Sequence, residues 1–160
     1  MTIRSKLIVF LITLSLPLLL MSCKKSKYDV IPTVYVSFHI SLNDPLFLNL
    51  LSPFMYAYVD SSTNNLGQTA AGYDGNGIII FSYTDNEFYA YDRTCPYDYE
   101  VNQKSVKVNV VDDIYAVCPS CGTEYALFAN GTPAKGIGRY PLKNYRAAFD
   151  GTTNIFVSNY

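Results

Sequence analysis

The stretch Ile78-Ile-Ile-Phe-Ser-Tyr83, Thr84-Asp-Asn-Glu87 and Phe88-Tyr-Ala-Tyr-Asp92 has the pattern of a β-hairpin. Two runs rich in β-branched and aromatic residues flank a short polar turn, which is typical of paired antiparallel strands. The second run leads directly into Arg93-Thr-Cys95-Pro-Tyr97. We therefore expect the hairpin to hold Cys95 on a loop at one end of a β domain.

The same alternation of short apolar runs and turn residues continues to the end of the chain. Asn130-Gly131 and Asp150-Gly151 have the composition of hairpin turns, and residues 132–138 have that of a loop rich in Gly and Pro. Short strands at close spacing predict an all-β fold, an antiparallel sandwich or small barrel. We expect further strands at residues 33–40, 54–59, 106–110, 114–117, 124–128, 145–149 and 154–158.

Length and charge limit the range of functions. The chain has 160 residues, with 12 basic and 13 acidic side chains, so we expect one modest domain without a basic surface for nucleic acid. Fifteen tyrosines and nine phenylalanines favour β structure. The single histidine, His39, is far in sequence from every cysteine after residue 90, and we expect it to be an ordinary strand residue.

The first 22 residues have the features of a secretory signal, with Arg4 and Lys6 ahead of an apolar run from Leu7 to Leu20. Leu20-Met-Ser-Cys23 resembles the lipobox of bacterial lipoproteins, which implies lipidation of Cys23 and a membrane anchor in the cell envelope. The alternative is an ordinary cleaved signal, with Cys23 as a structural thiol. The predicted division is a signal peptide at 1–22, a lipidated tether at 23–32 and a β domain at 33–160.

A second cysteine motif, Ala116-Val-Cys118-Pro-Ser-Cys121-Gly, follows the first by about twenty residues. With Cys23 lipidated, three cysteines remain, and an odd number cannot all pair within one chain. A metal site with three thiolates avoids this problem, as does one disulfide with one buried thiol. An exported compartment permits disulfides.

The two cysteine motifs and their flanks resemble the Rieske family, in which Cys-x-His and Cys-x-x-His loops at the tips of adjacent hairpins bind a 2Fe-2S cluster. Cys95 and Cys118 match the two cysteine ligands, and Gly131-Thr-Pro-Ala-Lys-Gly136 is similar to the proline loop that covers the cluster. The resemblance begins near Gly72 and extends to the C-terminus. It implies a Rieske-like antiparallel β-sandwich with two cysteine loops at hairpin tips.

Both histidine ligands of the family are replaced, the first by Tyr97 and the second by Cys121. The resemblance therefore implies a cofactor site of Cys95, Tyr97, Cys118 and Cys121, in which the three cysteines are metal ligands and Tyr97 or the nearby Asp98 is the fourth. A 2Fe-2S cluster is the leading candidate. Zinc held by three thiolates and an oxygen ligand is the second, and a metal-free domain with a Cys118–Cys121 or Cys95–Cys118 disulfide is the third.

These residues suggest an exported, lipid-anchored iron-sulfur protein that passes single electrons to an envelope partner. Because no nucleophile is paired with a base, we do not predict an independent enzyme. The competing hypothesis is a zinc- or disulfide-stabilised binding module that presents Tyr97, Tyr99 and Tyr125 to a protein or glycan. Tyr99 and Tyr125 are expected to be aromatic lids over the β core rather than partners of the sulfurs. Residues 33–72 carry no functional signal.

Overall fold

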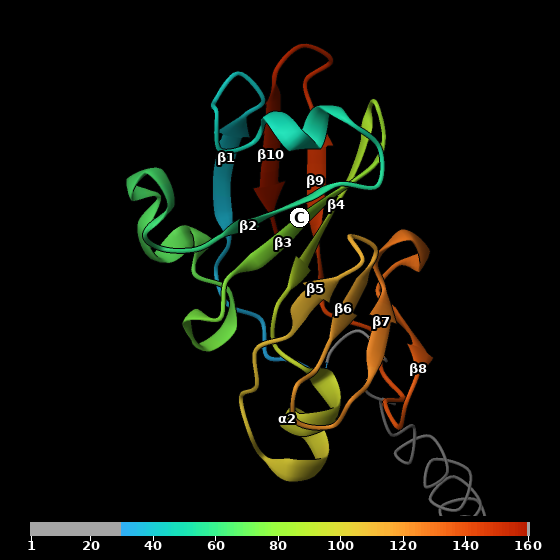
Figure 1. The fold of residues 1–160 in the computed structure, drawn as a ribbon. Coiled ribbons are helices and arrows are strands. Elements are labelled where there is room, and N and C mark those ends of the chain that lie inside the picture. Colours follow the sequence, from blue (N-terminus) through green and yellow to red (C-terminus); the bar gives the residue numbers. More distant parts are fainter. Residues whose placement is uncertain (1–29, 160) are drawn as a thin grey trace, which may run out of the picture.

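The computed structural model describes residues 30–159, which form two antiparallel sheets (Figure 1). The larger sheet has the strand order β1-β10-β9-β4-β3-β2 and the smaller has the order β5-β6-β7-β8. The all-β antiparallel fold is confirmed. The strands are β1 (Ser37–Ser41), β2 (Tyr56–Val59), β3 (Ile78–Thr84), β4 (Glu87–Asp92), β5 (Asn109–Val111), β6 (Tyr115–Val117), β7 (Glu124–Ala126), β8 (Thr132–Lys135), β9 (Asn144–Phe149) and β10 (Asn154–Ser158).

The hairpin of β3 and β4 joins two separate hydrophobic cores. Ile78 and Ile80 contribute to one core, together with residues of β1, β9 and β10. Ile79 and Phe81 point to the other face of the strand and pack in a second core with Cys95, Cys118 and Tyr125. Successive side chains of a strand point to opposite faces, so a strand covered on both sides is apolar without alternation. This explains the continuous run Ile78–Phe81.

The helices of the described residues are short. They are one α-helix, α2 (Pro96–Asn102), and the 3-10 helices η3 (Leu48–Leu51), η4 (Thr63–Asn65), η5 (Gly67–Ala70), η6 (Tyr73–Gly75) and η7 (Leu127–Ala129). The sequence pattern did not predict α2, because a seven-residue helix is too short to show a periodic apolar stripe. Figure 1 shows α2 at the same end of the molecule as the loop between β6 and β7.

Residues 132–138, expected as a loop, begin with β8, which pairs with β7 and forms an edge of the smaller sheet. The register shifts between Glu124 and Tyr125, so this pairing is irregular. Pro133 is tolerated there because an edge strand leaves part of its backbone without a ladder partner. Because β8 is a strand and not part of a loop, the smaller sheet has four strands.

The packed part of the chain includes Val30 and Ile31, which are buried ahead of the expected domain start at Thr33. Lys143 Nζ donates hydrogen bonds to Ile31 O and Thr33 Oγ1, both at 3.1 Å, and fixes this entry segment beside β9. The signal peptide and Cys23 lie outside the described residues, so their assignments stay predictions. Within residues 30–159, no helix has the length and apolar character needed to cross a membrane.

Candidate metal centre

The first cysteine loop begins where β4 ends. Cys95 N donates to Val106 O at 2.8 Å, and Val108 N donates to Arg93 O at 2.7 Å, so the two segments form a short antiparallel ladder. Helix α2 is the tip of this ladder. Cys95 has extended backbone at the N-cap and Pro96 begins the helix, a position where its missing N–H costs nothing. The chain leaves the helix through Gln103, which adopts the left-handed conformation.

The second cysteine loop closes the hairpin of β6 and β7. Cys118 N donates to Thr123 O at 2.9 Å, and Gly122 N returns a bond to Cys118 O at 3.0 Å. Gly122 has a φ of 69°, a conformation that glycine adopts without strain. The loop is therefore a tight turn that points Cys118 and Cys121 to one side. The expectation of two cysteine loops at hairpin tips is confirmed.

The segment expected to cover the site packs against the second loop. Gly138 N donates to Thr123 Oγ1 at 2.9 Å, and a Cβ on Gly136 would lie 2.8 Å from Thr123 Cα. Thr123 itself is fully buried and its hydroxyl also accepts from Cys121 Sγ at 3.2 Å. The two glycines therefore allow the segment to approach the turn closely and hold Cys121 in place.

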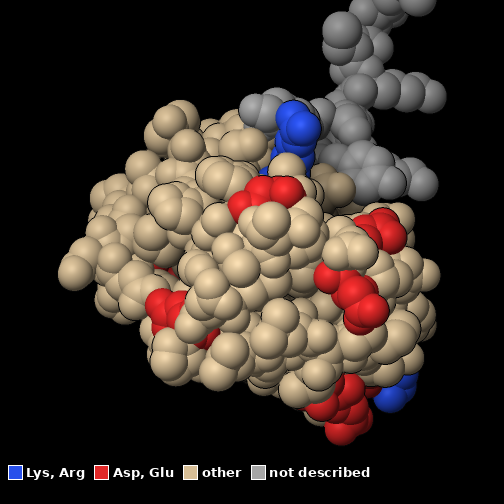
Figure 2. All heavy atoms as spheres, turned by 90° about the horizontal axis from the view of Figure 1, so that it is seen from above, with Lys and Arg blue, Asp and Glu red and all other residues tan. Residues whose placement is uncertain are grey.

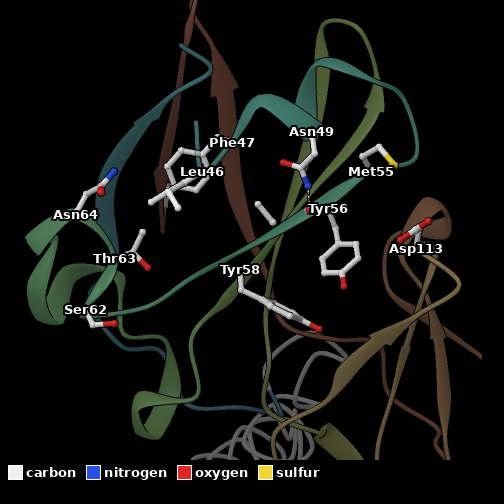
Figure 3. Close-up of a pocket in the computed structure, with 11 residues that line it drawn as sticks. Leu46, Phe47, Asn49, Met55, Tyr56, Tyr58, Ser62, Thr63, Asn64 and Asp113 are labelled. Atoms are coloured by element: carbon white, nitrogen blue, oxygen red, sulfur yellow. Dashed lines mark hydrogen bonds between the residues drawn. The ribbon is translucent and has the colours of Figure 1, made fainter. Parts of the chain in front are cut away.

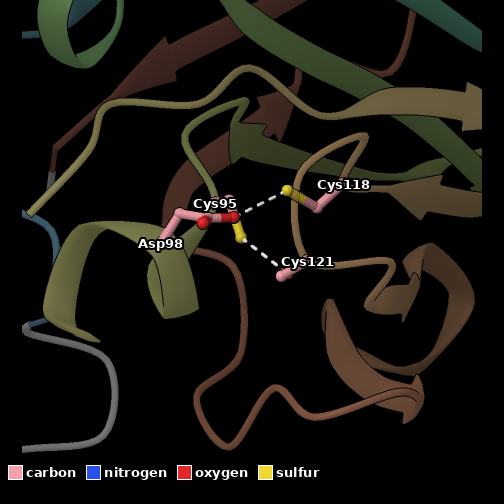
Figure 4. A group of neighbouring side chains, drawn as sticks. All are labelled: Cys95, Asp98, Cys118 and Cys121. Carbon is pink, nitrogen blue, oxygen red and sulfur yellow. Dashed lines mark hydrogen bonds between the residues drawn. The ribbon is translucent and has the colours of Figure 1, made fainter. Parts of the chain in front are cut away.

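Four possible ligand atoms converge between the two loops (Figure 4). The sulfurs of Cys95, Cys118 and Cys121 and one carboxylate oxygen of Asp98 all lie within 4.8 Å of one another. We call these four residues the donor group. Cys95 Sγ is 3.7 Å from Cys121 Sγ, and Cys118 Sγ donates to Asp98 Oδ2 at 2.9 Å. Cys121 is half-buried and the other three are buried.

Asp98 was named from the sequence only as an alternative to Tyr97, and it is the residue whose carboxylate reaches the sulfurs. Its Oδ1 accepts hydrogen bonds from Asn102 Nδ2 at 2.8 Å and Ser120 Oγ at 2.9 Å. Burial alone raises the pKa of Asp98, but the hydrogen bonds from Cys118, Asn102, Ser120 and Cys121 outweigh it and lower the pKa to about 2. The side chain is therefore a carboxylate at neutral pH.

Tyr97 is half-buried and packs at the edge of the second core. Successive residues of an α-helix point about 100° apart around its axis, so the side chain of Tyr97 leaves the helix in a different direction from that of Asp98. The assignment of Tyr97 as a ligand stays a prediction.

Cys118 and Cys121 are thiols in the metal-free chain. A hydrogen bond with Cys95, burial and the hydrogen bond to Asp98 all raise the pKa of Cys118, and burial raises that of Cys121. A thiol with a raised pKa is a poor nucleophile, which argues against thiol-disulfide exchange through Cys118 and Cys121.

Cys95, Cys118 and Cys121 are all free cysteines, so the structure contains neither of the two disulfides considered from the sequence. Metal binding would replace their protons.

Tyr125 corrects one expectation from the sequence. It is fully buried in the second core, as an aromatic lid would be, but its hydroxyl also lies 3.3 Å from Cys95 Sγ. Burial, followed by the charge of Cys95, raises the pKa of Tyr125, so the hydroxyl keeps its proton and can donate to the sulfur. Tyr99 instead packs edge-on against Tyr73, with ring centroids 5.3 Å apart.

Asp92 and Arg93, which lead into the first cysteine loop, are buried and take part in separate hydrogen-bond networks. Asp92 accepts from Tyr73 N, Thr94 N and Tyr145 Oη at 2.6 to 2.9 Å. Arg93 donates to Val108 O and Asn109 Oδ1, and its guanidinium lies 3.6 Å from the centroid of the Tyr58 ring. Both networks fix the backbone that leads to Cys95.

The comparisons with known proteins give only distant likenesses. No family model and no curated protein matches the chain. Among solved structures, the chain is similar to the ferredoxin of carbazole 1,9a-dioxygenase from Nocardioides aromaticivorans IC177, with 16% identity, a TM-score of 0.43 and coverage of 78% of this chain and 97% of that one. It is also similar to a nitrite reductase NADPH (small subunit) oxidoreductase protein, with 17% identity, a TM-score of 0.39 and coverage of 78% and 98%. Similarities this distant do not identify a function, so the function has to be inferred from the residues of the site.

Proposed function

We propose that this chain is an exported, lipid-anchored protein of the bacterial cell envelope whose donor group holds a thiolate-ligated iron centre for single-electron transfer. The convergence of three sulfurs and one carboxylate within 4.8 Å, from two loops that a β scaffold fixes, carries this proposal. Hydrogen bonds already hold each of the four donors in the metal-free chain. A bound metal would take the place of the thiol protons and join all four donors at one point.

The donor set suits iron. Thiolates are the usual ligands of iron-sulfur centres, and soft sulfur ligands select against magnesium and calcium. The Rieske resemblance adds that Cys95 and Cys118 correspond to cluster ligands, with a 2Fe-2S cluster as the family's cofactor. When bound, iron would supply a one-electron redox couple, and the anionic ligands in place of imidazoles would lower its reduction potential.

The exposure of the second loop suits electron exchange with a partner. Pro119 and Ser120 at the tip of the loop are exposed and Cys121 is half-buried, whereas Cys95 and Cys118 are buried. The centre is thus shielded from water on its inner side and close to the surface on its outer side. A redox partner in the envelope would dock against this tip.

The test of the iron centre uses the full chain, purified in detergent without air from cells supplied with iron. We expect bound iron, a visible absorption band that bleaches on reduction, and an EPR signal in one oxidation state. The Cys95→Ser variant should lose the band and the iron. A colourless wild-type protein without iron would contradict electron transfer.

The anchor is tested separately, by feeding cells an alkyne-labelled fatty acid and following its incorporation. We expect label on the wild-type chain and none on Cys23→Ser. Equal labelling of both chains would overturn the lipid anchor without affecting the metal proposal.

A second candidate function is a binding module in which the donor group holds zinc for stability, and an open cleft of about 640 Å³ favours it. Figure 3 shows Tyr56 and Tyr58 projecting from β2 into this cleft, with Asp113 of the β5–β6 turn on the facing side. Leu46, Leu51 and Phe54 are exposed on the neighbouring segment. Aromatic rings beside polar groups are common in ligand sites.

The surface seen from above in Figure 2 is mostly uncharged, with separate acidic and basic groups. Among the described residues that line the cleft, Asp113 alone is charged, so a neutral ligand would suit this candidate better than a polyanion. Zinc without iron in the purified protein would favour the binding module.

A further inference from the structure

We propose that the donor group binds a single metal ion, with Asp98 as its fourth ligand, in place of the two-iron cluster that the Rieske resemblance implies. This inference rests on the proposed function, because it concerns the metal centre of the same site. It assigns one metal ion where the resemblance implies two irons, and it selects Asp98 over Tyr97 as the fourth ligand.

The separations of the donor atoms are those of ligands around one ion. Thiolates at 2.3 Å from a tetrahedral metal lie about 3.8 Å from one another, and the sulfurs of Cys95 and Cys121 are 3.7 Å apart. A two-iron cluster instead holds its ligands as two pairs on different irons, and the spacing of the irons separates the pairs. The donor group shows no such division, because all four atoms lie within 4.8 Å of one another.

The hydrogen bonds of Asp98 are those of a carboxylate that offers one oxygen to a metal. Oδ2 faces the sulfur of Cys118 at 2.9 Å, where the thiol proton lies between the two atoms. Oδ1 accepts hydrogen bonds from Asn102 and Ser120. Ligating carboxylates are commonly held by hydrogen bonds on their second oxygen, which fixes their orientation. A metal ion would take the place of the thiol proton.

The sulfurs of Cys95 and Cys121 also have neighbouring hydroxyl groups that can fix their orientation. Cys95 Sγ lies beside the Tyr125 hydroxyl, and Cys121 Sγ lies 3.2 Å from Thr123 Oγ1. Four protein ligands close a tetrahedral site and leave no open position for water or substrate. The site is therefore suited to hold zinc or a single iron for structure or electron transfer, and not to activate a bound water.

The test is native mass spectrometry of the full chain in detergent, with metal analysis and an assay for acid-labile sulfide on the same sample. We expect one zinc or iron per chain and no labile sulfide. Asp98→Asn should weaken binding of the added metal by at least about tenfold. Asp98→Cys should keep one metal per chain, because a thiolate can take the same tetrahedral position. Asp85→Asn, an exposed aspartate away from the donor group, is the matched control and should bind as the wild type does.

The outcomes separate this inference from the proposed function. Two irons and two labile sulfides per chain would overturn the single-ion site and leave electron transfer in place. A wild-type chain that binds neither iron nor zinc would overturn both. One metal per chain with unchanged binding by Asp98→Asn would overturn the assignment of Asp98 as a ligand.

Discussion

Cys118 Sγ donates a hydrogen bond to Asp98 Oδ2 at 2.9 Å and so joins the two cysteine loops directly. The two residues are twenty positions apart, one on helix α2 and the other after β6. Ser120 donates to the same carboxylate, so the tip of the second loop is tied to the helix at two points. Asp98 therefore orders the site in the metal-free chain as well as offering it a ligand.

The first prediction concerns the pH dependence of this link. The pKa of Asp98 is lowered to about 2 in the folded chain from an ordinary value of 3.8. A lowered folded-state pKa gives stability that is present above the unfolded value and is lost as the pH falls through the folded value. In the metal-free protein, Asp98→Asn should reduce the free energy of unfolding near neutral pH. The difference from the wild type should shrink as the pH falls from about 4 toward 2. A difference that stays constant over this range would show that the charge of Asp98 does not stabilise the fold.

The second prediction concerns the buried pair Tyr145 and Asp92. Burial, with the nearby charge of Asp92, raises the pKa of Tyr145, so its hydroxyl stays protonated and donates to Asp92 Oδ2 at 2.7 Å. Tyr145→Phe leaves a buried carboxylate oxygen with one partner fewer and should cost about 1–3 kcal/mol of unfolding free energy. Tyr35→Phe, the same change at a side chain that is 73% exposed, is the control. Equal effects of the two changes in denaturant unfolding would contradict the role of the pair.

The third prediction concerns the close approach of Gly136 to the second loop. Gly136 has a φ of 95°, and an added Cβ would lie 2.8 Å from Thr123 Cα. Gly136→Ala should destabilise the chain through backbone strain, which typically costs on the order of 1–3 kcal/mol, with a further cost from the contact with Thr123. Gly151→Ala is the matched control, because its φ is 81° but an added Cβ there meets no atom within 4 Å. The melting temperature of Gly136→Ala should be lower than that of Gly151→Ala. The reverse order would show that the segment around Gly136 does not pack on the turn of the second cysteine loop.

The fourth prediction concerns the hydroxyl of Tyr125, which lies 3.3 Å from Cys95 Sγ. Hydrogen bonds to thiolate sulfur stabilise the reduced, more negative state of an iron centre and so raise its reduction potential. In the iron-loaded protein, Tyr125→Phe should lower the potential measured by redox titration. Tyr99→Phe, whose ring packs on Tyr73, should leave it unchanged. An equal potential in wild type and Tyr125→Phe would mean that the hydroxyl does not donate to the sulfur.

The strands near the cysteine loops were predicted well, because apolar runs between turn residues identify hairpins. The strand expected at 114–117 is β6 (Tyr115–Val117), and the strand expected at 124–128 begins with β7 (Glu124–Ala126). The three cysteines were also predicted to share a site, since two hairpin tips bring residues far apart in sequence together. Tyr97 and Cys23 stay untested as site residues.

Asp98 and Tyr125 were harder to place, because a sequence does not show which side chain of a loop points toward which. A signal for Asp98 was nevertheless present. Proline is favoured at the first position of a helix and an acidic residue in its first turn, and Pro96 and Asp98 fit these two positions. The helix then fixes the direction of the carboxylate. The cleft beside Tyr56 and Tyr58 carried no sequence signal, because its lining comes from segments that are unremarkable one by one.

X-ray absorption spectroscopy at the edge of the metal that the purified full chain contains tests the central claim most directly. The account predicts a first shell of about three sulfur atoms near 2.3 Å and one oxygen near 2.0 Å, with no second metal close by. A shell of oxygen and nitrogen alone would contradict thiolate ligation by Cys95, Cys118 and Cys121, and with it the proposed centre.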